Sequence, residues 1–212
     1  MKVAVLGITG YTGSNIAREL VARGHDVTGL ARRTLDADIP EGVLAVAGDV
    51  HDPTTIATIT QDVDAIVSAT RGHMEGGDLP TVLPALVAAA QAVDARLGIV
   101  GGASSLRRGP DGPLLIDDGF PDEWRSEAEP LIAVLETLRA SDAGVDWFFL
   151  SPPEIYGAHS PGERTGVYRT GLDELVVGAD GRSTIGGEDY AIAFVDELEK
   201  PAHRRQRFTV GY

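Results

Sequence analysis

The sequence predicts an α/β fold in which helices cover both faces of a parallel sheet, a doubly wound arrangement. Short, apolar, β-branched segments alternate with longer helical patterns, and the alternation repeats five times. A glycine cluster follows the first apolar segment directly. Repeated strand–helix units place their strands in parallel through right-handed crossovers, with helices on both faces. We expect one domain over residues 1–212, since this length is usual for a single α/β domain.

The expected strands are short and almost continuously apolar, as strands covered on both faces are. After Leu150 the sequence becomes polar and rich in turn residues, and we interpret residues 151–187 as an elaboration on the substrate side. In chain order we expect strands at Lys2–Leu6, Asp26–Ala31, Val43–Ala47, Asp64–Ala69, Arg96–Val100, Asp146–Leu150 and Arg207–Val210.

The expected helices lie between these strands. The first ends at Gly24 and the fourth at Gly144, because glycine adopts the left-handed conformation that often follows a helix. Asp52, followed by proline, is typical of a helix start. The fourth helix has two potential starts, a capping box that begins at Ser126, or Pro130 one turn later. The expected helices are Thr12–Arg23, Pro53–Gln61, Leu79–Ala95, Glu127–Ala143 and Glu188–Glu199.

Charge and composition exclude several classes of protein. The net charge of −14 gives no overall attraction for nucleic acid or anionic lipid. The lack of cysteine excludes disulfides, iron–sulfur clusters and cysteine nucleophiles. The longest apolar run, Leu83–Val93, is too short to cross a bilayer, and Lys2–Leu6 is typical of a core strand rather than a signal peptide. We therefore expect a cytoplasmic protein with a small-molecule partner, and the oligomeric state stays open.

The glycine cluster indicates a phosphate-binding turn. Gly7, Gly10 and Gly13 recur at steps of three, between an expected strand and an expected helix. Such a turn lets the backbone approach a pyrophosphate, and the helix N-terminus then faces the diphosphate. An isolated glycine triplet would indicate only a tight turn, but this context predicts dinucleotide binding. No lysine follows the glycines, which excludes a Walker-type loop. The predicted contacts from this loop are Gly7, Thr9, Gly10, Tyr11, Thr12 and Gly13.

The end of the second expected strand favours NADP over NAD. A site for NAD carries an acidic residue there, about 20 residues after the glycines, to bind the ribose 2′-hydroxyl. This chain instead has Arg32 and Arg33, with no acidic residue before Asp36. A guanidinium group can pair with the 2′-phosphate of NADP. We therefore predict NADP(H), with NAD(H) as the alternative.

Ligands of open parallel sheets bind at the carboxyl ends of the strands, so the residues that follow other strands are further candidates. Asp49 is placed to accept a hydrogen bond from the adenine amino group. These candidates are Asp49 and Val50 after the third strand, Ser68, Ala69 and Thr70 after the fourth, and Gly102 after the fifth.

The sequence lacks the common catalytic groups of this fold. No tyrosine is followed by a lysine four residues later, which excludes the proton relay of sugar epimerases and ordinary short-chain dehydrogenases. The segment that starts at Gly102 lacks the closing glycine of a nucleophile elbow. The five histidines show no i, i+4 pair, so no metal site is expected.

Several short motifs together carry a family resemblance. The chain resembles the atypical short-chain dehydrogenase group of NAD(P)H-binding proteins, which includes the NmrA-like proteins. Within this group it is most similar to bacterial NADH-flavin reductases and, more distantly, to biliverdin reductase B. The motifs are the glycine loop, Ala31–Arg33, Gly48–Val50, Gly101–Ser105, Leu150–Pro153, Pro161–Gly166 and Glu188–Ala191.

The resemblance implies a Rossmann-like domain, NAD(P)H as hydride donor, and flavins or other flat conjugated compounds as acceptors. In the biliverdin reductase B group a serine after the fifth strand lies near the nicotinamide, and Ser104 occupies that place. The double-proline motif adds Pro152 to the expected cofactor contacts. A histidine follows that motif in the same group, whereas this chain has Glu154, which argues against tetrapyrrole reduction.

Our first interpretation is an NADPH-dependent flavin or quinone reductase, with FMN or another flavin as substrate. Reduced flavin can take its proton from water, so the missing relay fits this chemistry. Ser104 and Tyr156 are the candidate catalytic residues. The alternatives are a non-catalytic NADP(H)-binding redox sensor of the NmrA type, and a reductase for imines or enones. The residues expected to line the acceptor site are Trp124, Glu154, Arg164 and Tyr168.

Overall fold

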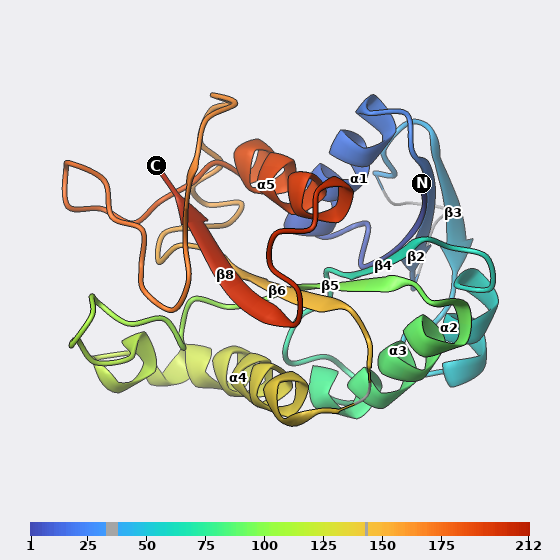
Figure 1. The fold of residues 1–212 in the computed structure, drawn as a ribbon, viewed down its shortest axis with the longest axis horizontal. Helices are drawn as coiled ribbons and strands as arrows, with labels where there is room; N and C mark the ends of the chain where they lie inside the picture. The colour runs from blue at the N-terminus through green and yellow to red at the C-terminus, as the bar shows by residue number, and fades with distance from the viewer. Residues whose placement is uncertain (33–37, 143) are drawn as a thin grey trace.

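The computed structural model describes residues 1–32, 38–142 and 144–212, and within them one mixed sheet forms the centre of the molecule (Figure 1). Its strand order is β3-β2-β1-β4-β5-β6-β8-β7, and every neighbouring pair is parallel except β7 with β8. This order confirms the predicted doubly wound, Rossmann-like fold. The strands are β1 (Lys2–Leu6), β2 (Asp26–Ala31), β3 (Val43–Ala47), β4 (Ala65–Ser68), β5 (Arg96–Val100), β6 (Trp147–Ser151), β7 (Arg169–Gly171) and β8 (Gln206–Gly211).

Helices cover both faces of the sheet (Figure 1). On one face, α1 (Tyr11–Ala22) packs beside α5 (Gly187–Glu199) over a core that includes Phe148 and Phe194. The other face carries α2 (Pro53–Ile59), α3 (Leu79–Val93) and α4 (Arg125–Ala140), over a core that includes Phe149. None of these helices combines the length and apolarity needed to cross a bilayer within the described residues.

Two predicted helix signals are confirmed. Gly24 follows the end of α1 with φ +79°, in the left-handed region that suits glycine. The side chain of Asp52 accepts a hydrogen bond of 2.9 Å from the amide of Thr54, and Pro53 is the first residue of α2. Both signals depend on a few adjacent residues, which is why the sequence alone could predict them.

The predicted boundaries of the fourth helix are wrong. A 3-10 turn at Asp122–Trp124 leads directly into α4, which begins at Arg125, so neither Ser126 nor Pro130 starts it. The helix ends at Ala140, four residues before Gly144. The preceding turn already has helical backbone geometry, so the helix needs no side-chain cap at its start.

The sequence analysis also missed the short strand β7. It lies within the segment 151–187 and pairs with β8 in antiparallel fashion, with Thr170 opposite Val210. Arg169 and Thr170 are exposed, so the strand lacks the apolar signal on which the prediction depended.

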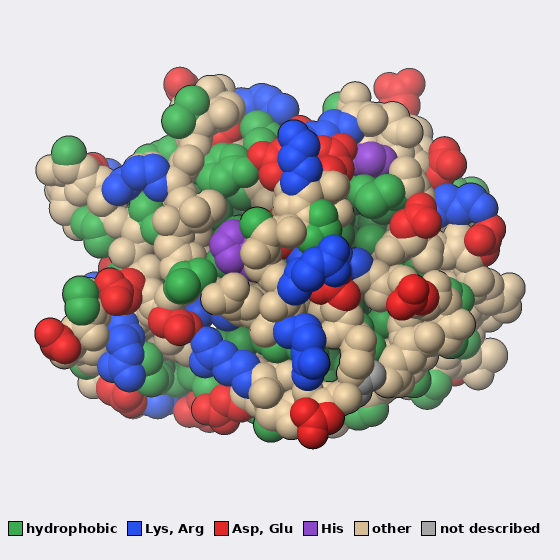
Figure 2. All heavy atoms as spheres, in the orientation of Figure 1, with side chains coloured by type: hydrophobic (Ala, Val, Ile, Leu, Met, Phe, Trp, Pro, Cys, Tyr) green, Lys and Arg blue, Asp and Glu red, His purple; other side chains and the backbone are tan. Residues whose placement is uncertain are grey.

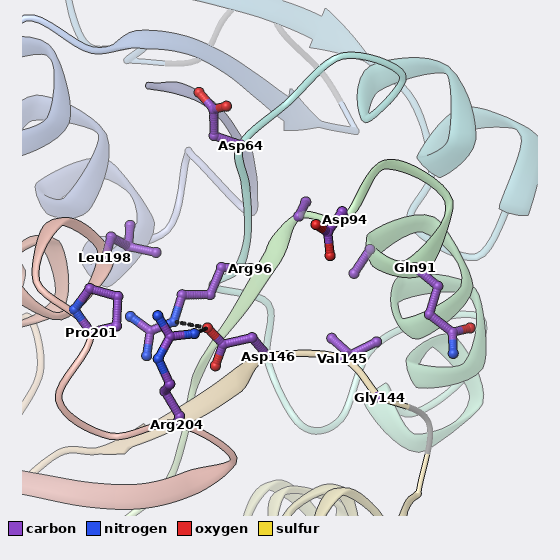
Figure 3. Close-up of a pocket in the computed structure, with 12 residues that line it drawn as sticks. Asp64, Gln91, Asp94, Arg96, Gly144, Val145, Asp146, Leu198, Pro201 and Arg204 are labelled. Atoms are coloured by element: carbon purple, nitrogen blue, oxygen red, sulfur yellow. Dashed lines mark hydrogen bonds and ion pairs between the residues drawn. The ribbon is translucent and has the colours of Figure 1, made fainter.

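A cluster of charged residues lies at the amino-terminal edge of the sheet, beside a cavity of about 440 Å³ (Figure 3). Buried Arg96 pairs with buried Glu197 at 2.6 Å and lies 3.3 Å from Asp146, whose carboxylate also pairs with Arg204. His203 completes the cluster, with its Nδ1 2.7 Å from Glu197. Ligands of this fold bind at the opposite, carboxyl-terminal edge, so we assign the cluster a structural role.

Acidic and basic side chains are interspersed over the face of the molecule shown in Figure 2. The acidic surplus therefore does not form one continuous surface on this face. The field of the whole protein is screened within about 10 Å at ordinary salt concentrations. Basic side chains beside the binding site must therefore bind any anionic ligand.

Candidate functional site

The glycine loop has the geometry of a phosphate-binding turn. Gly7 follows β1 with φ +90°, and a Cβ there would lie 2.6 Å from the carbonyl oxygen of Ala69. A Cβ on Gly13 would lie 2.2 Å from the carbonyl oxygen of Gly7. These two glycines are therefore required by the turn and by the close packing of α1 against the sheet.

Gly10 is different, because within the described part of the chain a Cβ there would meet only the carbonyl oxygen of Gly7, at 3.3 Å. Gly10 is the N-cap residue of α1 and has no side chain to cap the helix. The first-turn amides of α1 are thus available to an anion, with the positive end of the helix dipole behind them. This arrangement fits the diphosphate of a dinucleotide.

A cavity of about 200 Å³, the cofactor cavity, lies over this loop at the carboxyl ends of β1 to β4. Most of the predicted cofactor contacts line it, whereas Ser68 is buried beneath, with its hydroxyl 3.0 Å from that of Thr70. The lining includes Gly7, Thr9, Gly10, Arg32, Asp49, Val50, His51, Ala69, Thr70, Arg71, Met74 and Glu75.

Arg32 lies at the end of the cofactor cavity with its side chain 68% exposed. Its Nη1 lies 3.4 Å from a carboxylate oxygen of Glu75, which is itself 91% exposed. Such an exposed pair contributes little stability, so the guanidinium can turn to a phosphate. Arg33, the second predicted phosphate contact, lies outside the described residues.

Asp49 is held in place by His51. The Oδ1 atom accepts 2.9 Å and 2.8 Å hydrogen bonds from the amide and Nδ1 of His51, whose Nε2 lies 2.8 Å from the carbonyl oxygen of Gly77. These hydrogen bonds from the backbone and ring of His51 lower the pKa of Asp49. The hydrogen bond to Gly77 and the one to Asp49 raise the pKa of His51. The side chain of Asp49 is 57% exposed and lines the cofactor cavity, so its carboxylate can still accept a hydrogen bond from an adenine amino group.

A larger cavity of about 530 Å³, the acceptor cavity, adjoins the first, and Arg71 lines both. Residues of the segment that precedes α4 and of the segment that follows β6 line it. Its apolar wall includes Phe120 and Trp124, whose rings pack edge to face at 6.2 Å. The predicted residues Gly102, Ser104, Pro152, Glu154, Tyr156 and Trp124 all line this cavity.

Ser104 carries an orphaned polar atom. Its Oγ is buried and has no hydrogen-bond partner among the described residues, although Ser104 lines the acceptor cavity. Burying an unpaired hydroxyl costs free energy, so such an atom indicates a missing partner. A bound ligand with a carbonyl or amide group would satisfy it.

Tyr156 joins the acceptor cavity to the glycine loop. Its hydroxyl lies 2.9 Å from that of Thr12, and its ring packs at 5.7 Å from that of Tyr11 and at 4.7 Å from that of Tyr190. Burial raises the pKa of Tyr156 above its ordinary value, so the phenol stays protonated at neutral pH. Tyr11 and Thr12 thus support the wall of the site rather than line the cofactor cavity.

Two residues that were expected to line the acceptor site lie elsewhere in the structure. Arg164 points to α1 instead, where its Nη1 pairs with buried Glu19 at 2.7 Å. The hydroxyl of Tyr168 donates a 2.5 Å hydrogen bond to Asp196 of α5. Both side chains are held on the α1–α5 face by buried or partly buried carboxylates, away from the acceptor cavity.

The sequence analysis missed several cavity residues. Arg71 follows Thr70 after β4, so the rule used for the other strand ends could have found it. Glu75 and Arg108 had no such signal. Arg108 lines the acceptor cavity, and its guanidinium pairs with both carboxylate oxygens of Glu154 at 2.7 Å and 3.0 Å.

A nicotinamide dinucleotide fits this arrangement on three observations. The uncapped helix start at Gly10 suits the diphosphate, and exposed Arg32 suits the adenosine end. Ser104, whose buried hydroxyl is unpaired among the described residues, lines the cavity that adjoins the first, where the nicotinamide end would lie. The chain would therefore hold the cofactor along the carboxyl edge of the sheet.

Comparisons with known proteins agree with this geometry. The chain is 34% identical over 220 aligned residues to the uncharacterized protein YwnB of Bacillus subtilis, covering 99% of this chain and 98% of YwnB. It is 38% identical to a candidate exported protein of Burkholderia pseudomallei, whose solved structure it matches over 100% of both chains with a TM-score of 0.85. A solved structure described as a candidate NADH-flavin reductase from Streptococcus pneumoniae is 29% identical, with a TM-score of 0.78 over 100% of this chain and 99% of that one.

The profile of a family described as NAD(P)H-binding matches residues 7–201, a span from the glycine loop to the end of α5. The fold, the uncapped glycine turn and this match lead to one conclusion: the chain belongs to the NAD(P)H-binding family.

Proposed function

We propose that the protein is an NADPH-dependent reductase that delivers hydride to a flavin or quinone-like acceptor. The observation that carries the proposal is the direct junction of the two cavities at Arg71. One cavity has the features of a dinucleotide site, and the other is large, partly apolar and lined by Ser104, whose buried hydroxyl is unpaired among the described residues. The described candidate flavin reductase from Streptococcus pneumoniae supports the class of reaction.

Bound NADPH would supply a hydride, and the acceptor would take that hydride and one proton from water, leaving NADP⁺ and the reduced acceptor. The protein's share is to position the acceptor ring against the cofactor. Phe120 and Trp124 offer an aromatic wall for a flat ring, and Ser104 offers a hydrogen bond to an acceptor carbonyl. Tyr156, held by Thr12, fixes the wall between the two cavities.

The same proposal treats residues 1–212 as one functional domain acting in the cytoplasm on small molecules. The family match over nearly the whole chain supports one domain. The strongly negative net charge supports a partner other than nucleic acid.

Steady oxidation of NADPH on addition of riboflavin, FMN or a quinone tests the activity. A redox sensor would bind NADPH without such turnover. A reductase for imines or enones would turn over only with its own acceptor. Tight NADPH binding with no turnover of any flavin or quinone would contradict the proposal and favour one of these alternatives.

We expect Arg32→Glu to weaken NADPH binding about ten- to a hundredfold, because a charge-assisted contact is worth about 1.5–3 kcal/mol. NADH, which lacks the 2′-phosphate, should be affected much less. Calorimetric titration measures the dissociation constants of both cofactors and shows whether the loss is specific to NADPH. Arg182→Glu is the matched control, since it makes the same charge reversal at an exposed loop position outside both cavities. Equal losses for the two cofactors would show that Arg32 does not bind the 2′-phosphate.

We expect Ser104→Ala and Tyr156→Phe each to lower turnover by less than about 100-fold, below the usual 10²–10⁴ contribution of general acid–base catalysis. Reduced flavin can take its proton from water, and the raised pKa of Tyr156 makes it a poor proton donor. Turnover measured over a pH series should show no bell-shaped profile. A loss above about 10³ with intact NADPH affinity would instead identify a proton donor, and a carbonyl, imine or enone acceptor.

A further inference from the structure

Among the described residues, the lining of the acceptor cavity carries more acidic than basic side chains. Its lining includes four carboxylates, from Asp118, Glu123, Glu127 and Glu154, against the guanidinium groups of Arg71 and Arg108. Two histidines, His73 and His159, complete the charged and titratable lining. An anion that enters this cavity thus meets a net repulsive field.

The guanidinium group of Arg108 is already paired. Arg108 binds both oxygens of Glu154, at 2.7 Å and 3.0 Å, and its Nε donates a 2.6 Å hydrogen bond to Asp118. This bidentate pairing uses the geometry that a phosphate or carboxylate of a ligand would need. An anionic acceptor would have to displace Glu154 and leave that carboxylate facing it.

Arg71 and His73 also lie beside acids, although the side chain of Arg71 is 81% exposed and is held less firmly than that of Arg108. The Nε of Arg71 lies 3.7 Å from a carboxylate oxygen of Glu127, and the Nδ1 of His73 lies 2.7 Å from one of Asp78. Glu127 is fixed in turn, because it accepts a 2.6 Å hydrogen bond from the amide of Gly72. The acidic surplus is therefore built into the loops around the cavity.

The cavity also offers neutral groups to a ligand. The aromatic wall of Phe120 and Trp124 suits a flat ring, and Trp124 is 58% exposed at the rim. The unpaired hydroxyl of Ser104 can donate to a carbonyl oxygen. These groups match the carbonyl-bearing ring of a quinone or an isoalloxazine.

We infer that the acceptor is uncharged where it enters this cavity: a plain quinone or a flavin without phosphate, in preference to phosphorylated, sulfonated or carboxylated compounds. The inference rests on the proposed reductase function and names the class of acceptor for that same site. The reaction is unchanged, with a hydride from the cofactor and a proton from water.

Riboflavin and FMN form the first matched pair for the test, because they share one ring system and differ in the phosphate. At low salt we expect kcat/KM for riboflavin to exceed that for FMN by about tenfold, since several like charges act on one phosphate. The difference in kcat/KM between the two flavins should become smaller at about 0.5 M salt, where charges are strongly screened. An equal or higher kcat/KM for FMN would overturn the inference.

A binding measurement separates the charge effect from catalysis. A naphthoquinone and its sulfonate are titrated against the protein without NADPH, and quenching of tryptophan fluorescence gives both dissociation constants. We expect the sulfonate to bind about tenfold more weakly. Equal or tighter binding of the sulfonate would also overturn the inference.

The variant Glu154→Gln should raise the FMN-to-riboflavin ratio of kcat/KM several-fold, about fivefold, by removing one charge and loosening Arg108. The matched control is Glu136→Gln, which removes the same charge from an exposed position of α4 outside the cavity and should leave the ratio unchanged. An equal change of the FMN-to-riboflavin ratio of kcat/KM in both variants would show that the charges of the cavity do not select the acceptor. If the protein binds NADPH but neither binds nor reduces either member of each pair, the proposed function itself fails.

Discussion

Replacing Gly10 with valine is expected to abolish binding of NADPH and NADH alike, with a loss of affinity above about 100-fold. The backbone of Gly10 is extended, at φ −77° and ψ 158°, so a β-branched residue is tolerated there. Among the described residues, its Cβ would meet the Gly7 carbonyl oxygen at 3.3 Å, a tight contact that a small shift relieves. Gly10 lines the cofactor cavity, so we expect the valine side chain to occupy part of that cavity. The diphosphate needs that space, so the folded protein should lose its cofactor. Titration calorimetry with both cofactors, together with thermal unfolding, measures the two effects separately.

The neighbouring glycine provides the contrast. A Cβ on Gly13 would lie 2.2 Å from the backbone oxygen of Gly7, so Gly13→Val should lower the melting temperature strongly, whereas Gly10→Val should not. Ala57→Val, at an exposed position of α2, controls for the added valine itself. Normal NADPH binding by a folded Gly10→Val protein would show that the diphosphate does not lie over the glycine loop.

The second large effect is expected for Arg96→Ala, which should lower the free energy of unfolding by about 3–5 kcal/mol, because it leaves a buried carboxylate without its partner. Arg96 and Glu197 are both buried and lie 2.6 Å apart. Urea denaturation measures the change. Arg204→Ala serves as the control, since Arg204 is mostly exposed and its pair with Asp146 should contribute no more than about 1 kcal/mol. Equal losses of unfolding free energy in the two variants would show that the buried Arg96–Glu197 pair contributes no more than an exposed ion pair.

The same cluster predicts that the free energy of unfolding depends on pH. Burial alone would raise the pKa of Glu197, but hydrogen bonds from Arg96 and His203 lower it below its ordinary value. A depressed pKa stabilises the folded state at a pH above the unfolded value of about 4.3, and this contribution disappears as the pH falls through the folded value. The stability of the wild-type protein should therefore fall more steeply below about pH 4 than that of Arg96→Ala. Parallel curves for the two proteins would contradict this assignment.

The sequence determined the fold class, the order of the main elements and the tight glycine turn after β1. The strand β1 at Lys2–Leu6 and the left-handed Gly24 are where the pattern predicts them, because hydrophobic periodicity and turn chemistry depend on a few adjacent residues. The strand ends also predicted most of the cofactor cavity, since parallel strands bring their carboxyl ends to one edge.

Only the tertiary structure decided which side chains meet across that edge. Arg32 pairs with Glu75 and Arg108 with Glu154, over separations of 43 and 46 residues. Arg164 was predicted to face the acceptor but pairs with Glu19, 145 residues away. Such contacts depend on strand order and on the paths of whole loops, which no local pattern encodes. The physical reason is that a charged side chain on a loop pairs with the nearest opposite charge in space, and only the folded chain determines which one that is.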